Sequence, residues 1–482
     1  MGRPNVLLIL SDDQGAWALG AAGNTEIHTP NLDALARRGL RFENAFCSSP
    51  VCSPARASLL TGRIPSGHGV HDFLQGHEAG SDGIDYLEGF PLVVDSFHEA
   101  GYRTGLIGKW HLGASDRPRP GFDHWFALEG GSSSYYRAVI YRGSRRAETT
   151  QYLTDVFADD ALSFLDGSVE QGQPFFLSLN FTAPHKPWAG QHPREATALY
   201  DDCAFSSCPQ ETPHPWLLQS RGVPVAAEPD IHAALVGYFA AVTAMDTAIG
   251  RVLERLEELG VRENTIVVFT SDNGFNCGQH GIWGKGNGTF PVNLYDSSVK
   301  VPLIVDHPGS ARRGLAEELV SAYDLAATLL DLAGLPTAPF ADGPGSSFAG
   351  AVRGAPTDTP RAAVVVFDEY GPARMIRTER WKYVHRYPFG PHELYDLTSD
   401  PLESLNLITV PDYANRVADL RRQMHEWFAR HTEARFDGSA LPVSGGGQTA
   451  PLADDPLAAF RPWDASRPTG RRAPSGAQKN QQ

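Results

Sequence analysis

Residues 5–13, NVLLILSDD, form an uninterrupted apolar run that ends in two adjacent carboxylates. Such a run, without polar alternation, is typical of a strand buried on both faces, as in the parallel sheets of α/β proteins. Four further apolar runs have the same character and lie at 103–107, 175–180, 265–270 and 301–305. The sequence therefore predicts a large sheet whose strands are covered on both sides.

Helical patterns lie between these runs. Residues 31–38 follow a Thr-Pro start, residues 152–165 are amphipathic, and residues 231–259 carry apolar side chains at helical spacing before a glycine stop. Alternating strands and helices indicate the α/β class. We expect a large mixed, mostly parallel sheet sandwiched by helices.

The pattern changes near residue 340. Residues 341–360 are rich in Gly, Pro and Ser and are typical of a linker. Three short strands are expected at 362–368, 375–377 and 381–387, followed by an amphipathic helix at 413–428. These predict a large domain over 1–340 and a smaller α+β subdomain with an antiparallel sheet over 361–437. The Gly-, Pro-, Ala- and Ser-rich residues 438–482 are expected to form an extended or disordered tail.

The charge balance excludes some partners. The chain has 41 Lys and Arg against 56 Asp and Glu, which gives a formal net charge of −15. Nucleic-acid binding needs a basic face, and steering toward an anionic membrane or a long polyanion also needs positive charge on the protein. The sequence therefore predicts neither nucleic acid nor membrane as a partner. A small anion can still bind where a few cations converge.

The compartment is inferred from the apolar stretches and the cysteines. Residues 5–10 are too short for the apolar part of a secretory leader, and the longest apolar stretch, 233–245, is expected to be too short to span a bilayer. Five cysteines, an odd and sparse set, fit a reducing compartment. We expect a cytoplasmic protein, although a leader removed from a longer precursor fits the same sequence. Cys203 and Cys208 could pair, join a metal site or remain free thiols.

The most specific motif is Cys52-Ser-Pro-Ala-Arg56, which continues as far as Arg63. Pro54 can open a helix in its first turn, which would place Cys52 at the N-terminus, where the backbone dipoles favour negative charge. Arg56 lies one turn further on and can reach the same point. A lone cysteine is more often a buried structural thiol. The pattern Cys-x-Pro-x-Arg, however, is the one read by enzymes that oxidise cysteine to formylglycine.

Acidic and amide side chains follow two of the expected strands. Asp12 and Asp13 follow the first strand, and Asp272 and Asn273 follow the strand at 265–270. The C-terminal ends of parallel strands meet at one edge of a sheet, where α/β enzymes bind their ligands. Hard oxygen donors suit Ca²⁺ or Mg²⁺ better than zinc. An acidic pair alone would be equally expected in a solvated turn, but two clusters at two strand ends favour a metal site.

Cations and histidines follow the same strands. The chain has only six lysines against 35 arginines. Lys109 and His111 follow the strand at 103–107, His185 follows the strand at 175–180, and Lys285 lies a short loop beyond Asn273. Each is expected at the same edge of the sheet, where histidines can serve as acid and base and cations can stabilise an anion.

From residue 5 to about residue 407 the chain resembles the sulfatase family of the alkaline phosphatase superfamily, on the motif that starts at Cys52 and on these clusters. The resemblance implies that 1–340 is a catalytic domain and that a formylglycine-generating enzyme converts Cys52. It implies hydrolysis of an organic sulfate monoester, such as a sulfated sugar or an aryl sulfate. It also implies Ca²⁺, with Mg²⁺ as the alternative. The implied metal ligands are Asp12, Asp13, Asp272, Asn273 and an oxygen of the modified Cys52.

The resemblance also implies roles for the other residues. Hydrated formylglycine is a geminal diol, of which one hydroxyl attacks sulfur and the other later loses a proton and ejects sulfate. Arg56 and Lys109 would stabilise the ionised diol, and His111 would take that proton. His185 and Lys285 would hold sulfate oxygens and protonate the leaving alcohol. A serine or asparagine often assists near the metal, and Ser132, Ser133 and Ser134 are equivalent candidates for that position.

Substrate contacts and alternative functions stay open at this point. Residues on loops over the strand ends could line the substrate pocket, or could equally be structural. These candidates are His71, Asp72, Trp188, His192, His280 and Arg386. Related phosphonate monoester and phosphodiester hydrolases typically have His at the position of Asn273, so the asparagine favours sulfate esters. An inactive binding protein with the same fold is the remaining alternative, which the complete residue set opposes.

Overall fold

Strand β1 (Asn5–Asp12) lies near the middle of a ten-stranded sheet, and all of its residues are buried. The fold is taken from a computed structural model, which describes residues 2–75, 84–217, 219–220, 223–224, 230–355, 363–368, 372–443, 445–452 and 456–460. Across the sheet the strands are β14 (Gly314–Ser321), β2 (Leu40–Phe46), β13 (Leu303–Asp306), β10 (Thr265–Ser271), β1, β7 (Phe175–Pro184), β3 (Arg103–Lys109), β4 (His124–Leu128), β5 (Ala138–Arg142) and β6 (Arg145–Thr149).

The central strands of the sheet are parallel. β1 pairs in parallel with β10 and β7, and β3 pairs in parallel with β7 and β4. Their C-terminal ends therefore lie at one edge. β13 is antiparallel to both β10 and β2, and β5 and β6 form an antiparallel margin. The predicted mixed, mostly parallel sheet is confirmed. The strand expected at 301–305 corresponds to β13.

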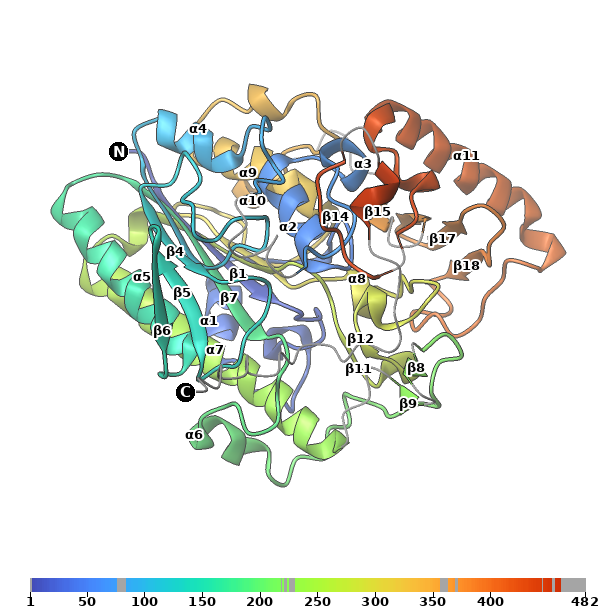
Figure 1. The fold of residues 1–482 in the computed structure, drawn as a ribbon, viewed down its shortest axis with the longest axis horizontal. Coiled ribbons are helices and arrows are strands. Elements are labelled where there is room, and N and C mark those ends of the chain that lie inside the picture. The colour runs from blue at the N-terminus through green and yellow to red at the C-terminus, as the bar shows by residue number, and fades with distance from the viewer. Residues whose placement is uncertain are drawn as a thin grey trace, which may run out of the picture.

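Helices cover both faces of this sheet (Figure 1). The helices are α1 (Pro30–Arg38), α2 (Cys52–Thr61), α3 (Pro65–His68), α4 (Val93–Glu99), α5 (Leu153–Glu170), α6 (Arg194–Thr197), α7 (Ile231–Glu258), α8 (Asp296–Val299), α9 (Leu325–Leu332), α10 (Ala349–Arg353) and α11 (Ala414–His431). Side chains alternate between the faces of a strand. Leu8 and Leu10 pack in one apolar cluster with α2, α4 and α9, whereas Leu7 and Ile9 pack in another with α1, α5 and α7.

Helix α7 is longer than the apolar stretch noticed in the sequence. By length and composition its 28 residues could cross a membrane, which corrects the expectation that this stretch is too short. However, 72% of its most apolar window is buried inside the protein. It packs on α5, α1 and β7, which is the environment of a core helix.

A second, smaller sheet is antiparallel and lies toward the C-terminus. Its strands are β15 (Ala363–Asp368), β16 (Ala373–Thr378), β17 (Trp381–Arg386) and β18 (Glu393–Asp396). Helix α11 packs on it through the buried side chains of Leu420, Met424 and Phe428. The expected antiparallel sheet and helix are therefore confirmed, whereas the expected linker over 341–360 contains the short helix α10, whose Val352 is buried. Residues 356–360 lie outside the described residues.

The remaining short strands are β8 (Gln219–Ser220), β9 (Val223–Pro224), β11 (Asn276–Cys277) and β12 (Trp283–Gly284).

The segment after residue 437 is not wholly a free tail. Gly438, Leu441, Val443 and Gln448 are buried, and the backbone N–H of Gly438 donates to the Ser66 hydroxyl at 3.2 Å. Of the two expected alternatives, the buried contacts of this part oppose a disordered tail and leave the extended one open. The composition of this part suggests disorder, but its few side chains find partners in loops far away in the sequence. Residues 461–482 lie outside the described residues. Cys203 and Cys208 are not joined by a disulfide.

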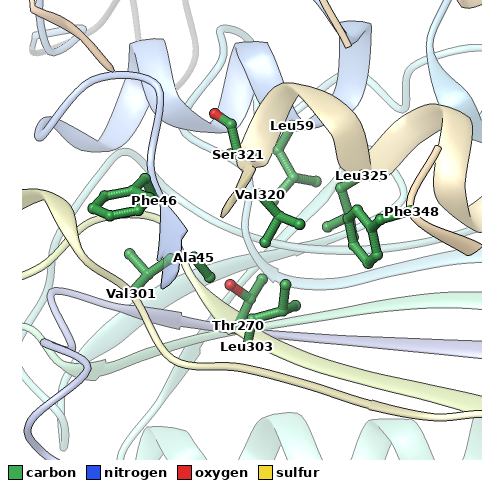
Figure 2. A pocket seen from close by; sticks show the side chains of 11 residues that line it. Ala45, Phe46, Leu59, Thr270, Val301, Leu303, Val320, Ser321, Leu325 and Phe348 are labelled. Atoms are coloured by element: carbon green, nitrogen blue, oxygen red, sulfur yellow. The ribbon is translucent and has the colours of Figure 1, made fainter. Parts of the chain in front are cut away.

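A small cavity lies between the large sheet and the layer of α2 and α9 (Figure 2). Leu59 of α2, Leu325 of α9 and Phe348 line one side of it, and residues of β2, β10, β13 and β14, among them Val320, make up most of the remaining lining. Apart from the hydroxyls of Thr270 and Ser321, its lining is apolar. The cavity is a packing gap in the core, so the chemistry must be sought at the edge of the sheet.

A buried ionic cluster joins the two sheets. The fully buried Lys382 of β17 donates to the Leu294 carbonyl at 2.9 Å and lies 2.6 Å from the carboxylate of Asp296, which begins α8. Its ammonium also pairs with Glu403, whose carboxylate accepts from the Asp296 backbone N–H at 2.6 Å. Asp296 also pairs with Arg377 of β16 at 3.4 Å, so two carboxylates share Lys382 and one of them has a second cation.

Replacing Lys382 tests this joint. Lys382→Met is expected to destabilise the fold by about 3–5 kcal/mol, because it leaves the buried Glu403 without its cation and Asp296 with Arg377 alone. The control is Arg194→Met, since Arg194 pairs with the exposed Asp201 at 2.9 Å and such a surface pair contributes little to stability. Denaturant unfolding measures both. Equal losses in the two variants would show that the buried cluster does not join the sheets.

Candidate active site

One edge of the large sheet gathers the polar side chains that the sequence singles out. Because β1, β3, β7 and β10 are parallel neighbours, residues at their C-terminal ends come together. They are Asp12 and Asp13 at β1, Lys109 at β3, His185 directly after β7, and Asp272 and Asn273 directly after β10. Helix α2 begins at Cys52 and points its N-terminus at the same place, and Arg56 follows one turn later.

Three buried carboxylates meet at this edge. Oxygens of Asp12, Asp13 and Asp272 all lie within 4.8 Å of one another. The Asn273 amide donates from Nδ2 to Asp13 at 2.8 Å and to the Gly274 carbonyl at 2.9 Å. Its Oδ1 atom is buried and has no hydrogen-bond partner within the part of the chain that the structure describes. Three carboxylates and one unsatisfied amide oxygen form a donor set that fits a hard divalent cation.

The backbone is strained at the centre of this cluster. Asp13 has φ of +66°, a conformation that residues other than glycine rarely adopt. The Tyr238 hydroxyl donates to the Asp13 carbonyl at 2.9 Å, and the Asp13 backbone N–H donates to Asp272 at 3.2 Å. Both contacts hold the strained residue in place, as is common at functional sites.

Each carboxylate contacts one cation. Lys109 Nζ lies 2.5 Å from Asp12, Arg56 Nε lies 2.9 Å from Asp272, and Lys285 Nζ lies 2.5 Å from Asp13. The backbone of Lys109 is held in place as well, because Arg56 Nη1 and Asn180 Nδ2 donate to its carbonyl at 2.9 and 3.1 Å. The site therefore combines three negative and three positive groups in a buried space.

The carboxylates differ in acidity. Burial alone would raise the pKa of Asp13, but Lys285 and His185 outweigh it and hold this pKa below its usual value. Burial, with Asp12 next, raises the pKa of Asp272 to about 6 despite Arg56. Arg56 therefore does not fully offset burial and the charge of Asp12 at Asp272, and a cation bound beside this carboxylate would lower its pKa again.

Cys52 lies between the carboxylate cluster and the Lys285 ammonium. Its Sγ is 3.6 Å from Asp12 Oδ1 and 2.7 Å from Lys285 Nζ. Burial raises the pKa of the Cys52 thiol to about 12, although Lys109 and Lys285 act to lower it. The encoded thiol is therefore protonated at neutral pH and is not a thiolate nucleophile.

His111 is held in one orientation. Its φ is +57°, and its ring packs so closely on Gly131 that a Cβ there would lie 2.3 Å from the imidazole. Nε2 lies 3.0 Å from the Leu74 carbonyl, and since a carbonyl only accepts, Nε2 carries the hydrogen. Burial and Lys109 hold the pKa of His111 well below its usual value. The neutral ring therefore has its basic lone pair on Nδ1.

His185 borders both Cys52 and the carboxylates. One ring nitrogen lies within 4.8 Å of ligand atoms of Asp12 and Cys52, and Nε2 is 3.7 Å from Asp13. Burial lowers the pKa of His185 to about 3, although Asp13 acts to raise it. The Tyr135 hydroxyl donates to the His185 carbonyl at 2.8 Å and helps to position it.

The serine candidates are engaged nearby. Ser133 Oγ donates to the Ser134 carbonyl at 2.6 Å, and Ser134 Oγ donates to Gln191 at 2.9 Å. Ser132 is exposed, and the choice among the three serines for the assisting role stays open.

The six substrate-binding candidates are not gathered into one pocket by the contacts that the described chain shows. Trp188 packs among aromatic side chains and donates to the Pro184 carbonyl at 2.7 Å, and both oxygens of Asp72 accept from backbone N–H groups. Arg386 is buried and donates to the Val292 carbonyl at 2.8 Å. The polar groups of these three already have structural partners, so substrate binding by them has no support.

The other three candidates each have a partner of their own. His192 lies 2.9 Å from the Tyr152 hydroxyl, His280 stacks on Tyr295 with ring centroids 3.7 Å apart, and His71 packs on Phe460. Their role in substrate binding stays a prediction.

Sequence reasoning missed the residues that support the site from behind. The hydroxyls of Tyr135 and Tyr238 donate to the backbone carbonyls of His185 and Asp13, and no motif marks these tyrosines. Asn180 could have been found, because it ends the apolar run 175–180 in the same way that Asp272 follows the run 265–270.

Comparison with known proteins agrees with this geometry. A family model described as Sulfatase matches residues 4–335, and one described as N-sulphoglucosamine sulphohydrolase, C-terminal, matches residues 278–430. The chain is 28% identical to the N-acetylglucosamine-6-O-sulfatase of Bacteroides thetaiotaomicron, over 88% of this chain and 86% of that protein. It is 29% identical to the choline-sulfatase of Rhizobium meliloti, over 85% of this chain and 83% of that protein.

A solved structure shows the same architecture with a substrate bound. The protein in that solved structure is in complex with its own substrate, D-glucosamine-2-N,6-O-disulfate. It matches the present chain with a TM-score of 0.76 and 25% identity. The match covers 91% of this chain and 100% of that one.

The carboxylate cluster predicts cation-dependent stability. Adding Ca²⁺ or Mg²⁺ to metal-free protein is expected to raise the melting temperature, because a ligand that binds only the folded state adds about 2.7 kcal/mol at one hundred times its Kd. Asp272→Asn is expected to lose most of this shift, as followed by scanning calorimetry. The control is Asp160→Asn, which removes a buried carboxylate outside the site, one that pairs with His124 at 2.6 Å. The rise in melting temperature on adding the cation should persist in this control. Equal shifts in Asp272→Asn and the parent protein would contradict the metal site.

Proposed function

Because the chain belongs to the sulfatase family of sulfuric ester hydrolases, we propose that it removes sulfate from a sulfated sugar, with Cys52 converted to formylglycine and with Ca²⁺ at the carboxylates. The observation that carries the proposal is the position of Lys285. Its ammonium contacts both Cys52 Sγ, at 2.7 Å, and Asp13, at 2.5 Å. Cys52 and the carboxylate cluster therefore share the Lys285 ammonium. A sulfate group between them would contact the nucleophile, the cluster and this ammonium.

The residues at the carboxylate cluster fit a metal ion, which the family implies. Asp12, Asp13, Asp272 and the unsatisfied Oδ1 of Asn273 would hold it. Oxygen donors alone, with three carboxylates among them, support Ca²⁺. When bound, the ion polarises a sulfate oxygen and stabilises negative charge nearby. Since the three cations already balance the three carboxylates, the ion would leave a local surplus of positive charge, which attracts a sulfate monoester despite the net charge of −15.

Conversion of Cys52 is supported by the state of its thiol. With a pKa of about 12, the thiol cannot ionise at neutral pH, so the encoded residue is a poor nucleophile where one is needed. The hydrated aldehyde supplies two hydroxyls, one to attack and one to release the product. Sγ stands at the position of these oxygens, which places them between Asp12 and Lys285.

The other side chains supply charge and proton transfer. Lys109 and Arg56 are fixed by their carboxylate partners, so their positive charge needs no rearrangement when negative charge develops. His111 offers Nδ1 as the base for the step that releases sulfate. Lys285 faces the space beside Cys52, and its ammonium can hold a sulfate oxygen. His185 donates from Nδ1 to the Lys186 carbonyl at 2.8 Å and borders the same space, so it can protonate the leaving alcohol only after an anionic substrate has raised its pKa and Nε2 has taken up a proton.

A sulfated sugar is proposed because two of the compared proteins act on one by their descriptions, while a third acts on choline sulfate. The phosphonate monoester or phosphodiester hydrolase is the alternative. Asn273 opposes it, since those relatives typically have His there. Comparison of kcat/KM for an aryl sulfate and an aryl phosphonate separates the two functions, and a panel of sulfated sugars with choline sulfate identifies the alcohol.

Activity is expected to follow the modification of Cys52. Protein produced with and without a formylglycine-generating enzyme should release sulfate in proportion to the aldehyde content of the residue-52 peptide, as measured by mass spectrometry. Cys52→Ser is expected to release at most one equivalent of alcohol, because a serine ester has no second hydroxyl to expel sulfate. Cys203→Ser, a half-buried thiol outside the site, is the control and should retain full activity. Sustained turnover by wholly unconverted protein would contradict the mechanism.

The two histidines are expected to act in different steps. His111→Ala should slow sulfate release by about 10²- to 10⁴-fold, the usual contribution of a general base, and so produce a burst of alcohol. His185→Ala should instead slow alcohol release, most strongly for weakly acidic alcohols that need protonation. Rapid-quench measurement of both products distinguishes them, with the half-exposed His98→Ala as control. An identical response of the two variants to leaving-group acidity would show that this division of roles is wrong.

A further inference from the structure

A C-terminal strap crosses the loop that follows the nucleophile helix. We define the strap as residues 445–452 and the nucleophile loop as residues 69–75. The Gln448 backbone N–H donates to the Phe73 carbonyl at 3.0 Å, and the Gln75 N–H donates to the Gln448 carbonyl at 3.4 Å. This pairs Leu74 and Gln448 as a parallel bridge. In Figure 1 the red end of the chain returns from α11 toward the blue helices α2 and α3.

The Gln448 side chain fastens the strap to the loop. It is completely buried, and its amide is fully used. Oε1 accepts from the His71 N–H at 2.8 Å, and Nε2 donates to the carbonyls of Gly69 and Ala450, both at 3.0 Å. A buried amide that satisfies three backbone groups is costly to replace, because each lost bond leaves a buried polar group unsatisfied.

Further contacts fix the same register. The Gly447 N–H donates to Asp72 at 3.0 Å, and Gln75 Nε2 donates to the Gly446 carbonyl at 2.6 Å. The strap and the loop are therefore held together by Gly446, Gly447 and Gln448.

Leu74 connects the paired strap and loop to the active site. Its backbone N–H donates to the hydroxyl of Ser53, the neighbour of Cys52, at 3.1 Å. Its carbonyl is the acceptor, at 3.0 Å, that keeps the hydrogen of His111 on Nε2. A shift of Leu74 would therefore disturb both the base and the residue beside the nucleophile, although Gln448 touches neither.

We infer that Gln448 is a positioning residue that holds Leu74 in register and thereby fixes the orientation and tautomer of His111. The inference rests on the proposed function for the role of His111. It explains why a segment at the far end of the chain is ordered against the first third of it. The effect is expected mainly on the chemical steps, because the backbone groups of Leu74 contact His111 and Ser53.

The test replaces Gln448 by Met, which keeps the length of the side chain but removes its three hydrogen bonds. At equal formylglycine content, kcat is expected to fall by about 10- to 100-fold with KM changed less than about twofold, the effect of a small misplacement of a reacting group. A burst of alcohol should appear, as expected for loss of His111. The matched control is Thr449→Val on the same strap, which removes only the 3.4 Å contact to the Ala459 carbonyl and should behave as the parent protein.

A second readout does not depend on turnover. In ¹⁵N-histidine-labelled protein, the ring resonances of His111, assigned with His111→Gln, should shift in Gln448→Met and stay unchanged in Thr449→Val. If Gln448→Met does not fold, Gln448→Asn keeps an amide on a side chain one methylene shorter and should show the same changes. An unchanged kcat, or a lowered kcat with unchanged His111 resonances, would overturn the inference. Absence of sulfate ester hydrolysis in the parent protein would refute the proposed function instead, and the resonances would still report on Gln448.

Discussion

The site depends on confining three carboxylates in a buried space. Two unit charges about 4 Å apart at an effective dielectric constant near 20 repel by roughly 4 kcal/mol, so three such pairs would cost about as much as the whole stability of a typical domain. Lys109, Arg56 and Lys285 relieve this repulsion one carboxylate at a time. The arrangement persists only because cations are built in, and it provides the fixed positive field that sulfate ester hydrolysis needs.

The parallel sheet makes this confinement possible. Neighbouring parallel strands end at the same edge, so residues that are 259 positions apart, such as Asp13 and Asp272, are brought within hydrogen-bonding distance by the register of β1 and β10. Backbone strain concentrates at the same edge, at Asp13 and His111. The aromatic hydroxyls and backbone carbonyls behind these residues keep that strained geometry in place, which links the packing of the core to the orientation of the reacting groups.

Much of this arrangement could be predicted from the sequence, and the limits have physical causes. Apolar runs that end in polar residues mark buried strands and the edge at which they finish, so β1, β3, β7 and β10 and the residues after them were found together. β2 and β14 were missed because polar residues interrupt their patterns, as expected for strands near the margin of the sheet. The contacts of Tyr238 and Gln448 join positions 225 and 377 apart in the chain through single backbone groups, and such contacts have no local pattern. The substrate-pocket candidates rest on residue type alone, and since Trp188, Asp72 and Arg386 each contact structural partners, their role in substrate binding stays a prediction.

The most direct measurement is a crystal structure of the formylglycine-bearing protein grown with Ca²⁺, with anomalous diffraction recorded to locate the ion. The account predicts one strong peak about 2.3–2.6 Å from oxygens of Asp12, Asp13, Asp272, Asn273 and residue 52. A fully converted crystal at saturating Ca²⁺ without density among these five residues, or with the ion bound only elsewhere, would contradict it.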